Sequence, residues 1–356
     1  MIKHPLYIKA ACAISPQHSF GDTPILDPVV QSENNRLIAL DVDYRAFINP
    51  VAIRRMSRLL KMSISAAIKC LQNAGVSMPD AIITGTGRGS AGDMQHFLKD
   101  MILMKEEALN PTFFIQSTYN APNGWIALQS KSTGYNQTFV HRGISLELAL
   151  LDAQLLLAEA GDHQNILIGC YDETTADYFV VKEKLNYWKK ETIPSEHLYR
   201  NNETLGSIAG EGAAFFAVSG EKEGAVCSIA SLEVIHQPAP TMIRNKVQEV
   251  LAANGLTTDD IDVVICGRSG DVRFEAWYGV LEDFATQTIA GFKHLCGEYE
   301  TSSGFALWLA HQIFAQGTVP ECTVLQKGDR KEIRHMLIIN HFILDTVSVM
   351  LLKSLR

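Results

Sequence analysis

The segment at residues 146–160 (LELALLDAQLLLAEA) constrains the fold strongly. Drawn as a helix, it has no continuous polar face, and a helix that is apolar all round is covered by other elements. The chain has 356 residues and is 47% hydrophobic, which is enough to bury a sizeable core. We therefore predict that this helix lies at the centre of a layered fold.

Strand-like and helix-like stretches alternate on both sides of this segment, which is typical of an α/β fold. Apolar side chains at helical spacing predict helices at residues 53–74 and 302–314. Short apolar runs predict strands at residues 80–85, 138–140, 165–170, 211–218, 227–235, 262–266, 336–340 and 347–352.

The second half of the chain repeats the order of elements in the first half. The strand pair 336–340 and 347–352 mirrors the pair 165–170 and 211–218, and residues 219–226 (SGEKEGAV) are small, charged and glycine-rich. We predict an N-terminal half at residues 1–222 and a C-terminal half at residues 223–356. No long linker separates the halves, so we expect them to share one core.

Charge and cysteine content exclude several classes of protein. A formal net charge of −8 without a basic stripe argues against nucleic acid as a partner. The apolar runs are too short to span a bilayer, and the N-terminal segment lacks the pattern of a signal peptide. The seven cysteines are scattered without a CxxC pair, which argues against a disulfide framework or a zinc site. We expect a cytoplasmic protein with reduced thiols, no metal and no cofactor.

Several segments, in this order along the chain, resemble the thiolase-like fold of β-ketoacyl synthases. They are residues 111–128 (PTFFIQSTYNAPNGWIAL), 146–160, 165–173 (NILIGCYDE), 210–218 (GEGAAFFAV) and 289–310 (IAGFKHLCGEYETSSGFALWLA). The third resembles the strand that ends in Gly-Gly-x-Glu, the fourth the Gly-Glu-Gly-Ala strand, and the fifth the Lys-x-x-x-Gly-His segment. The resemblance covers nearly the whole chain. It implies two related βαβαβ-type halves that form a five-layer αβαβα core.

A narrower resemblance is carried by the stretches INPVAIRRMSRLLKM, FFIQSTYNAPNGWIAL, TFVHRGISLELALLDA and CGEYETSSGFALWLA. They are similar to the ketosynthase-like proteins of aryl polyene and flexirubin pigment clusters. In such clusters a catalytic ketosynthase pairs with a chain-length-factor homologue. The resemblance therefore implies a heterodimer with an active ketosynthase, and contact with an acyl carrier protein through that complex.

The residues that a condensing ketosynthase needs are missing from the matching positions. The nucleophilic cysteine, which belongs at a helix N-terminus, is replaced by Gly143, or by Ile144 with a slip of one residue. The two histidines that stabilise a thioester enolate are replaced by Cys266 and Glu298, and a carboxylate would repel that enolate. The C-terminal loop at residues 341–345 (HFILD) lacks its glycines. The resemblance thus implies a chain without the catalytic Cys-His-His set.

Some polar residues of the family pattern remain. Lys293 and Glu211 match it, and each has a structural interpretation, Lys293 as an ion-pair partner and Glu211 as a buried carboxylate that holds loops. His141 and Arg142 precede the vacant nucleophile position. They are interpreted either as a polar plug or partner contact, or as a hydrogen-bonding pair at a strand end.

Two further residues could carry different chemistry. Ser145, at a helix start, is a candidate replacement nucleophile with His141 as its base, although serine there is more often a cap. Cys266 is a candidate reactive thiol, although a buried inert cysteine is the commoner state. The partial GxGxxG pattern at residues 85–89 is better explained by a tight turn than by a nucleotide-binding loop.

Phe113, Phe114, Ile115 and Gln116 match the family's dimer interface, where it lines the acyl tunnel. Their bulk would set the tunnel depth, or they would simply pack the interface.

These observations leave three functional hypotheses. The first is a non-catalytic, chain-length-factor-like subunit of a condensing heterodimer. The second is an acyltransferase or thioesterase-like enzyme with a relocated nucleophile at Ser145 or Cys266. The third is a binding module for acyl carrier proteins alone, and the net negative charge counts against it because carrier proteins are themselves acidic.

Overall fold

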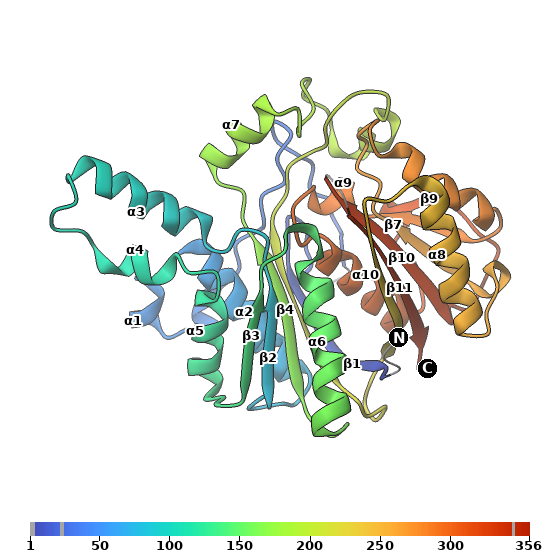
Figure 1. Cartoon of the computed structure of the whole chain (residues 1–356), viewed down its shortest axis with the longest axis horizontal. Helices are drawn as coiled ribbons and strands as arrows, with labels where there is room; N and C mark the ends of the chain where they lie inside the picture. Colours follow the sequence, from blue (N-terminus) through green and yellow to red (C-terminus); the bar gives the residue numbers. More distant parts are fainter. Residues whose placement is uncertain (1–3, 22–24, 344–345) are drawn as a thin grey trace.

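The computed structural model describes residues 4–21, 25–343 and 346–356. Its strands form one mixed sheet in the order β3-β2-β4-β5-β1-β6-β11-β10-β7-β8-β9 (Figure 1). The strands are β1 (Leu6–Ile14), β2 (Ala81–Gly85), β3 (Tyr135–Phe139), β4 (Ile166–Asp172), β5 (Gly212–Ser219), β6 (Cys227–His236), β7 (Val263–Cys266), β8 (Thr288–Gly291), β9 (Val324–Gln326), β10 (His335–Phe342) and β11 (Thr346–Ser354).

The helices connect these strands and cover both faces of the sheet (Figure 1). The α-helices are α1 (Pro50–Ile53), α2 (Arg58–Asn73), α3 (Ala91–Leu103), α4 (Pro111–Gln116), α5 (Ala121–Ser130), α6 (Ser145–Ala160), α7 (Ala176–Lys184), α8 (Pro240–Ala253), α9 (Lys293–Cys296) and α10 (Ser303–Gln316). The 3₁₀ helices are η1 (Tyr44–Ala46), η2 (Arg142–Ile144), η3 (Ser195–Arg200), η4 (Thr258–Asp260), η5 (Glu275–Phe284) and η6 (Glu321–Thr323). In the described part of the chain, none of these helices has the length and apolar character needed to cross a bilayer.

The sheet repeats one topology twice. From one edge, the first five strands run β3-β2-β4-β5-β1. Read inward from β8, next to the opposite edge strand β9, the corresponding order is β8-β7-β10-β11-β6. The pairings also correspond: β2 is parallel to β3 and β4, β7 is parallel to β8 and β10, and the remaining neighbours within each half are antiparallel. This confirms two related halves, which meet where β1 pairs with β6. The division at residue 222 stays a prediction, and β6 begins shortly after it.

The alternation of side chains along the strands produces the layers. On β4, Ile166 and Ile168 face a central cluster shared by α6 and α10, whereas Leu167 faces an outer cluster with α2. On β10, Ile338 faces the central cluster and Leu337 faces a second outer cluster with α8. Successive strand residues point to opposite faces. The central helices α6 and α10 therefore lie between the two half-sheets, with α2 on one outer face and α8 on the other. The predicted five-layer arrangement is confirmed.

Two predictions about helices were wrong in detail. The helix predicted at residues 53–74 begins only at Arg58, because Ser57 accepts the backbone N–H of Leu60 and caps α2 there. The segment at 146–160 does lie against the central layer, yet α6 is not covered all round. Its residue Leu155 is 44% exposed, whereas α10 is buried along most of its length.

The predicted strand at residues 138–140 is also shifted, because β3 begins earlier, at Tyr135, and ends at Phe139. Its pairing partner explains the bounds. Tyr135 lies in register with Ala81 and Phe139 with Gly85, the first and last residues of β2. The strand therefore ends before Val140, where the chain turns toward η2.

The contrast between the two central helices can be measured. Leu309 of α10 is fully buried, so Leu309→Ala should reduce the free energy of unfolding by about 2–5 kcal/mol. Leu155→Ala on α6 should change it by less than about 0.5 kcal/mol in the isolated chain, because the side chain is largely exposed. Denaturant unfolding of both variants checks this. Similar losses at the two positions would contradict the burial described for α6.

Candidate functional site

The strands β7, β8 and β10 end side by side in the C-terminal half. Cys266, the last residue of β7, lies in register with Gly291 of β8 and Ile339 of β10. Lys293 follows β8, and His341 lies near the end of β10. The carboxyl ends of parallel strands meet at the same edge of a sheet, so these residues gather in one place. The 3₁₀ helix η2, which leads into α6, packs against β10 and β11 beside them.

Gly143, the predicted nucleophile position, lies against the side chain of Phe342. A Cβ atom added at Gly143 would fall far inside the contact distance of about 3.5 Å from the Phe342 Cβ and Cγ atoms. Both residues are buried, and so is Ile144. The space that a cysteine side chain would need at this position is therefore filled by Phe342, the last residue of β10 and part of the stretch 341–345 where the sequence lacks glycine. Leu344 and Asp345 of that segment lie outside the described residues.

Ser145 ties the start of α6 to two neighbouring segments. Its buried hydroxyl lies 2.9 Å from the carbonyl oxygen of Thr86 and 2.8 Å from that of Arg142, and it accepts the backbone N–H of His141 at 2.8 Å. Its one proton is shared between two carbonyl oxygens, and one acceptor position is taken by the His141 N–H. Ser145 makes no side-chain cap to α6, which corrects the expectation of a helix cap.

His141 and Arg142 both lie at the surface. The ring of His141 is 6.3 Å from that of His236, edge to face, and its backbone N–H, rather than its imidazole, contacts the Ser145 hydroxyl. Arg142 adopts a left-handed backbone conformation with φ of 49° at the turn before α6. Their exposure suits contact with solvent or a partner better than a plug, because Phe342 already fills the interior.

Lys293 and Glu298 form a fully buried ion pair. The Lys293 ammonium lies 2.7 Å from a Glu298 carboxylate oxygen and donates to the carbonyl oxygen of His341 at 2.5 Å. Burial raises the pKa of Glu298 to about 7, and the nearby Lys293 charge opposes that shift. Burial likewise lowers the pKa of Lys293. Glu298, which the sequence analysis predicts at the second histidine position, therefore serves as the counter-ion of Lys293.

His341 is a central residue that the sequence analysis overlooked. Its Nδ1 atom lies 2.7 Å from the Tyr278 hydroxyl, and Nε2 lies 3.4 Å from the Ser269 hydroxyl. Burial, followed by the charge of Lys293, lowers its pKa well below the usual value, so the imidazole is neutral. The sequence did contain a signal for this residue, because a histidine begins the stretch 341–345 in which we noted only the missing glycines.

Cys266 has no solvent exposure at the end of β7. Burial raises the pKa of its thiol to about 11. Because the thiolate is the nucleophilic form, this thiol is unreactive near neutral pH.

Glu211 lies apart from that cluster and connects three segments. One carboxylate oxygen accepts the Arg58 guanidinium at 2.5 Å and the Ala39 backbone N–H at 2.9 Å, and the other accepts the Thr174 backbone N–H at 3.0 Å. Each contact brings a loop or a helix start to the beginning of β5. Glu211 thus joins the loops around the site without facing the Gly143 position.

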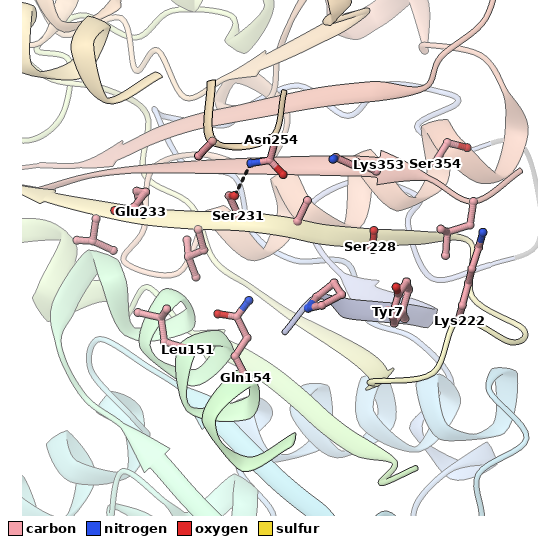
Figure 2. Close-up of a pocket in the computed structure, with 16 residues that line it drawn as sticks. Tyr7, Leu151, Gln154, Lys222, Ser228, Ser231, Glu233, Asn254, Lys353 and Ser354 are labelled. Carbon is pink, nitrogen blue, oxygen red and sulfur yellow. Dashed lines mark hydrogen bonds between the residues drawn. The ribbon is translucent and has the colours of Figure 1, made fainter. Parts of the chain in front are cut away.

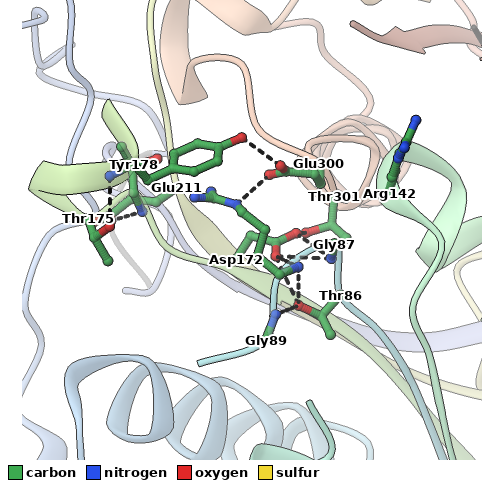
Figure 3. Close-up of polar contacts among 12 residues, drawn as sticks. Thr86, Gly87, Gly89, Arg142, Asp172, Thr175, Tyr178, Glu211, Glu300 and Thr301 are labelled. Carbon is green, nitrogen blue, oxygen red and sulfur yellow. Dashed lines mark hydrogen bonds and ion pairs between the residues drawn. The ribbon is translucent and has the colours of Figure 1, made fainter. Parts of the chain in front are cut away.

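The glycine-rich turn after β2 binds a buried carboxylate of the protein itself. Asp172 accepts the backbone N–H groups of Gly87 and Arg88 at 3.0 Å and the Thr301 hydroxyl at 2.8 Å (Figure 3). Burial and the neighbouring Glu300 raise the pKa of Asp172 to about 6. The amides of this turn are therefore occupied by Asp172, which agrees with a structural turn.

A second part of this network joins the helix α7 to the site. Arg88 pairs with Glu300 at 2.9 Å, and its guanidinium lies 3.6 Å from the centre of the Tyr178 ring. The Tyr178 hydroxyl donates to the other Glu300 oxygen at 2.8 Å (Figure 3). No sequence motif pointed to Arg88, Tyr178 or Glu300 as a group, since they come from three distant segments.

The predicted tunnel residues lie on α4, in the arm formed by α3 and α4 at the left of Figure 1. Phe114 is 57% and Ile115 62% exposed, whereas Phe113 stacks on His96 at 5.2 Å. Gln116 is buried and bonds to backbone atoms near the start of α2.

Ile115 and Gln116 line a largely apolar cavity of about 500 Å³ with residues of α1 and α5. Elsewhere, no group of three or more His, Cys, Asp or Glu placed to hold a metal ion occurs among residues 4–21, 25–343 and 346–356.

The contact between Gly143 and Phe342 predicts strong energetic coupling. Gly143→Cys should cost about 1–3 kcal/mol of unfolding free energy, because the new side chain overpacks the site. In a Phe342→Ala background the same change should cost less than half as much. A double-mutant cycle from denaturant unfolding measures the coupling. Additive effects of the two substitutions would refute the proposed steric conflict.

Glu173 gives a pH-dependent prediction. Burial raises its pKa from 4.5 to about 7, while one oxygen accepts the Gly92 backbone N–H at 2.8 Å. Between these pKa values the unfolded chain releases a proton that the folded chain keeps, so this group makes stability fall as pH rises through that window. Glu173→Gln keeps an acceptor for Gly92 and removes the titration. Its Tm should exceed that of the wild type by at least about 2 °C at pH 7.5, and by less at pH 5.

Exposed Glu223→Gln serves as the control for that experiment. It should shift Tm equally, if at all, at both pH values. A Glu173→Gln effect that does not change with pH would contradict the raised pKa.

Comparison with known proteins agrees with this geometry. The model of the β-ketoacyl synthase N-terminal domain matches residues 30–189. Comparison with curated protein sequences gives no match.

Solved structures resemble the whole chain. The ishigamide ketosynthase/chain length factor and a β-ketoacyl synthase from Burkholderia phymatum each have a TM-score of 0.79 and 14% identity, covering 99% of this chain and 100% of theirs. The AntDE:AntF complex, a type II polyketide-synthase acyl-carrier protein with its ketosynthase bound to the hexaketide, has a TM-score of 0.74 and 13% identity over the same shares. At these identities the solved structures show the fold alone, and the domain match covers less than half of the chain. The chain has the thiolase-like fold of β-ketoacyl synthases, and its residues 30–189 match the N-terminal domain of that family.

Proposed function

We propose that this chain is a non-catalytic, chain-length-factor-like subunit that pairs with an active β-ketoacyl synthase. The observation that carries the proposal is the family fold retained around a filled catalytic centre. Phe342 occupies the space at Gly143, Cys266 is a buried thiol, and Glu298 neutralises Lys293. A condensing enzyme needs a thiolate and enolate-stabilising groups at these positions.

The two edges of the sheet differ in a way that favours pairing at β3. Residues 135–137 of β3 are exposed, and the strand carries no charged side chain. At the other edge, β9 is only three residues long and is followed by the charged run at residues 327–332 (KGDRKE). Proteins protect free sheet edges with short strands and charges. The unprotected β3 edge is therefore the one suited to a partner strand.

The arm beside β3 extends this surface. Exposed apolar side chains occur along α3 and α4, namely Met94, Leu98, Ile102, Leu103, Phe114 and Ile115. A concentration of exposed apolar side chains on two neighbouring helices favours a protein interaction site. We propose that the arm packs on the ketosynthase and that Phe113, Phe114, Ile115 and Gln116 form part of the wall that limits the acyl chain.

The type of chain that the heterodimer elongates is proposed from the narrower sequence resemblance to pigment-cluster proteins. We propose that the heterodimer elongates chains of the aryl polyene or flexirubin type, in polyketide or fatty-acid-like synthesis, from an acyl carrier protein bound by the complex. The ishigamide structure, a ketosynthase/chain length factor, supports the pairing by its similarity of fold. Free cysteines throughout the chain are consistent with action in the cytoplasm.

The relocated-nucleophile alternative has no supporting contact. Ser145 is buried with its hydroxyl engaged by three backbone groups, and the pKa of Cys266 is raised to about 11. Neither group has the adjacent base that activates a nucleophile. Intact-mass analysis after incubation with an acyl-carrier-protein thioester should therefore find no adduct on the isolated chain.

Co-expression with a cysteine-containing ketosynthase of the aryl polyene type tests the pairing. The wild type should co-purify as a 1:1 complex. Ile115→Asp should weaken that complex at least about tenfold, because it places a charge in an apolar contact. The matched control is Leu325→Asp at the β9 edge, which is 39% exposed and should bind as the wild type does. A stable homodimer that ignores the ketosynthase would overturn the proposal.

A further inference from the structure

The apolar cavity beside α4, which we call the α4 pocket, differs in character from the larger groove over β6. Val51, Ala52, Met56, Ile115 and Trp125 supply most of its lining, from α1, the turn after it, α4 and α5 (Figure 1). The groove over β6, of about 720 Å³, is lined by many polar side chains and by charges of both signs (Figure 2). The α4 pocket therefore offers mainly apolar contact.

The amide side chains that line the α4 pocket are bonded within the protein. Asn49 accepts the Val51 backbone N–H at 2.9 Å. Gln116 accepts the Ser57 backbone N–H at 3.2 Å and donates to the Arg55 carbonyl oxygen at 2.6 Å. These bonds hold α4 against the turn between α1 and α2. The pocket is therefore preformed, which lowers the entropy that binding costs.

Arg55 is the charged residue of the α4 pocket. Within the described parts of the chain, its guanidinium and that of its exposed neighbour Arg54 form no ion pair and no hydrogen bond. The next arginine, Arg58, differs, because it pairs with Glu211 and Asp41. Among the described residues that line the pocket, none is an Asp or a Glu. A carboxylate that pairs with Arg55 must therefore come from another molecule.

The mouth of the pocket favours a protein surface over a small molecule. Val51 is 74% exposed and Ile115 is 62% exposed, although both line the pocket. A small molecule inside the pocket would leave the outer parts of these side chains in water, whereas a protein surface covers both. Ile115 also belongs to the arm that we propose to pack on the ketosynthase, so the same partner reaches the pocket.

Covering this region removes Arg55 from water, and a buried charge without a partner is strongly unfavourable. A complementary surface therefore presents an apolar side chain to the pocket and a carboxylate to the arginine. We propose that the α4 pocket receives a bulky apolar side chain of the ketosynthase, flanked by an Asp or Glu of the same partner that pairs with Arg55. This inference rests on the proposed function, because the occupant is the ketosynthase.

Titration of the purified ketosynthase with variants of the full chain tests the pocket. Thr112→Phe adds bulk to the pocket lining at a half-buried position. It should weaken the complex at least about tenfold while changing Tm by less than about 2 °C. Arg55→Gln should weaken the complex at least about fivefold and make its affinity less dependent on NaCl concentration. Exposed Lys331→Gln, in the loop after β9 at the opposite edge of the sheet, is the matched control and should bind as the wild type does.

Photo-crosslinking identifies the occupant of the pocket. With p-benzoylphenylalanine in place of Val51, mass mapping should locate the crosslink at one segment of the ketosynthase. Neutralising the Asp or Glu nearest that crosslink should weaken the wild-type complex and leave the Arg55→Gln complex unchanged, as a double-mutant cycle requires of a direct pair. Additive effects of the two changes would overturn the proposal, and so would a crosslink to a second copy of this chain alone.

The outcomes separate this inference from the pairing itself. If the wild type binds the ketosynthase and Thr112→Phe binds as tightly, the pairing stands and the assignment of the pocket is wrong. If the wild type does not bind, both are wrong. Saturable binding of decanoate to the isolated chain that Thr112→Phe removes would assign the pocket to a small carboxylic acid and would also overturn the proposal.

Discussion

The close approach of the central helices to the strand ends is the constraint on which the rest of the molecule depends. Gly85, at the end of β2, lies against the backbone of Ser145 at the start of α6, and Gly304 of α10 lies against the thiol of Cys170 on β4. A Cβ atom at either glycine would fall inside contact distance. This packing fixes η2 and the start of α6 beside the end of β10 and the start of β11, next to Gly143, Lys293 and Glu298.

The contacts around Gly143 and Lys293 fit one another. Phe342 occupies the space beside Gly143, and Glu298 supplies a counter-ion for the buried Lys293. Breaking a buried ion pair by removing one partner costs about 3–5 kcal/mol, because the remaining charge is left uncompensated. A cysteine introduced at Gly143 would meet Phe342, and Cys266 and Glu298 would remain at the positions where the sequence resemblance places the two histidines. These buried contacts stabilise the fold.

The proposed partner contact lies at the surface of the protein, away from the buried residues around Gly143. The free β3 edge and the apolar arm formed by α3 and α4 adjoin each other in sequence and carry the proposed partner contact.

The sequence alone determined the layered α/β fold and the two related halves, and its motif positions predict a chain without the Cys-His-His set. Those features depend on local periodicity and on residue identity at a few motif positions, which can be recognised without coordinates. It misplaced the start of α2 because the cap at Ser57 competes with the apolar pattern that begins at residue 53. It also overestimated the burial of α6, since periodicity does not say which neighbours cover a helix.

Only the tertiary structure decided what fills the centre. Phe342 meets Gly143, His341 contacts Tyr278 and Ser269, and Arg88 meets Glu300, although each group joins segments far apart in the chain. The alignment of Tyr7 on β1 with Ser228 on β6, and of Ser228 with Lys353 on β11, likewise exists only because the three strands pair in this register. Such contacts arise from packing and strand register, and these are set by the whole fold rather than by any local stretch of sequence.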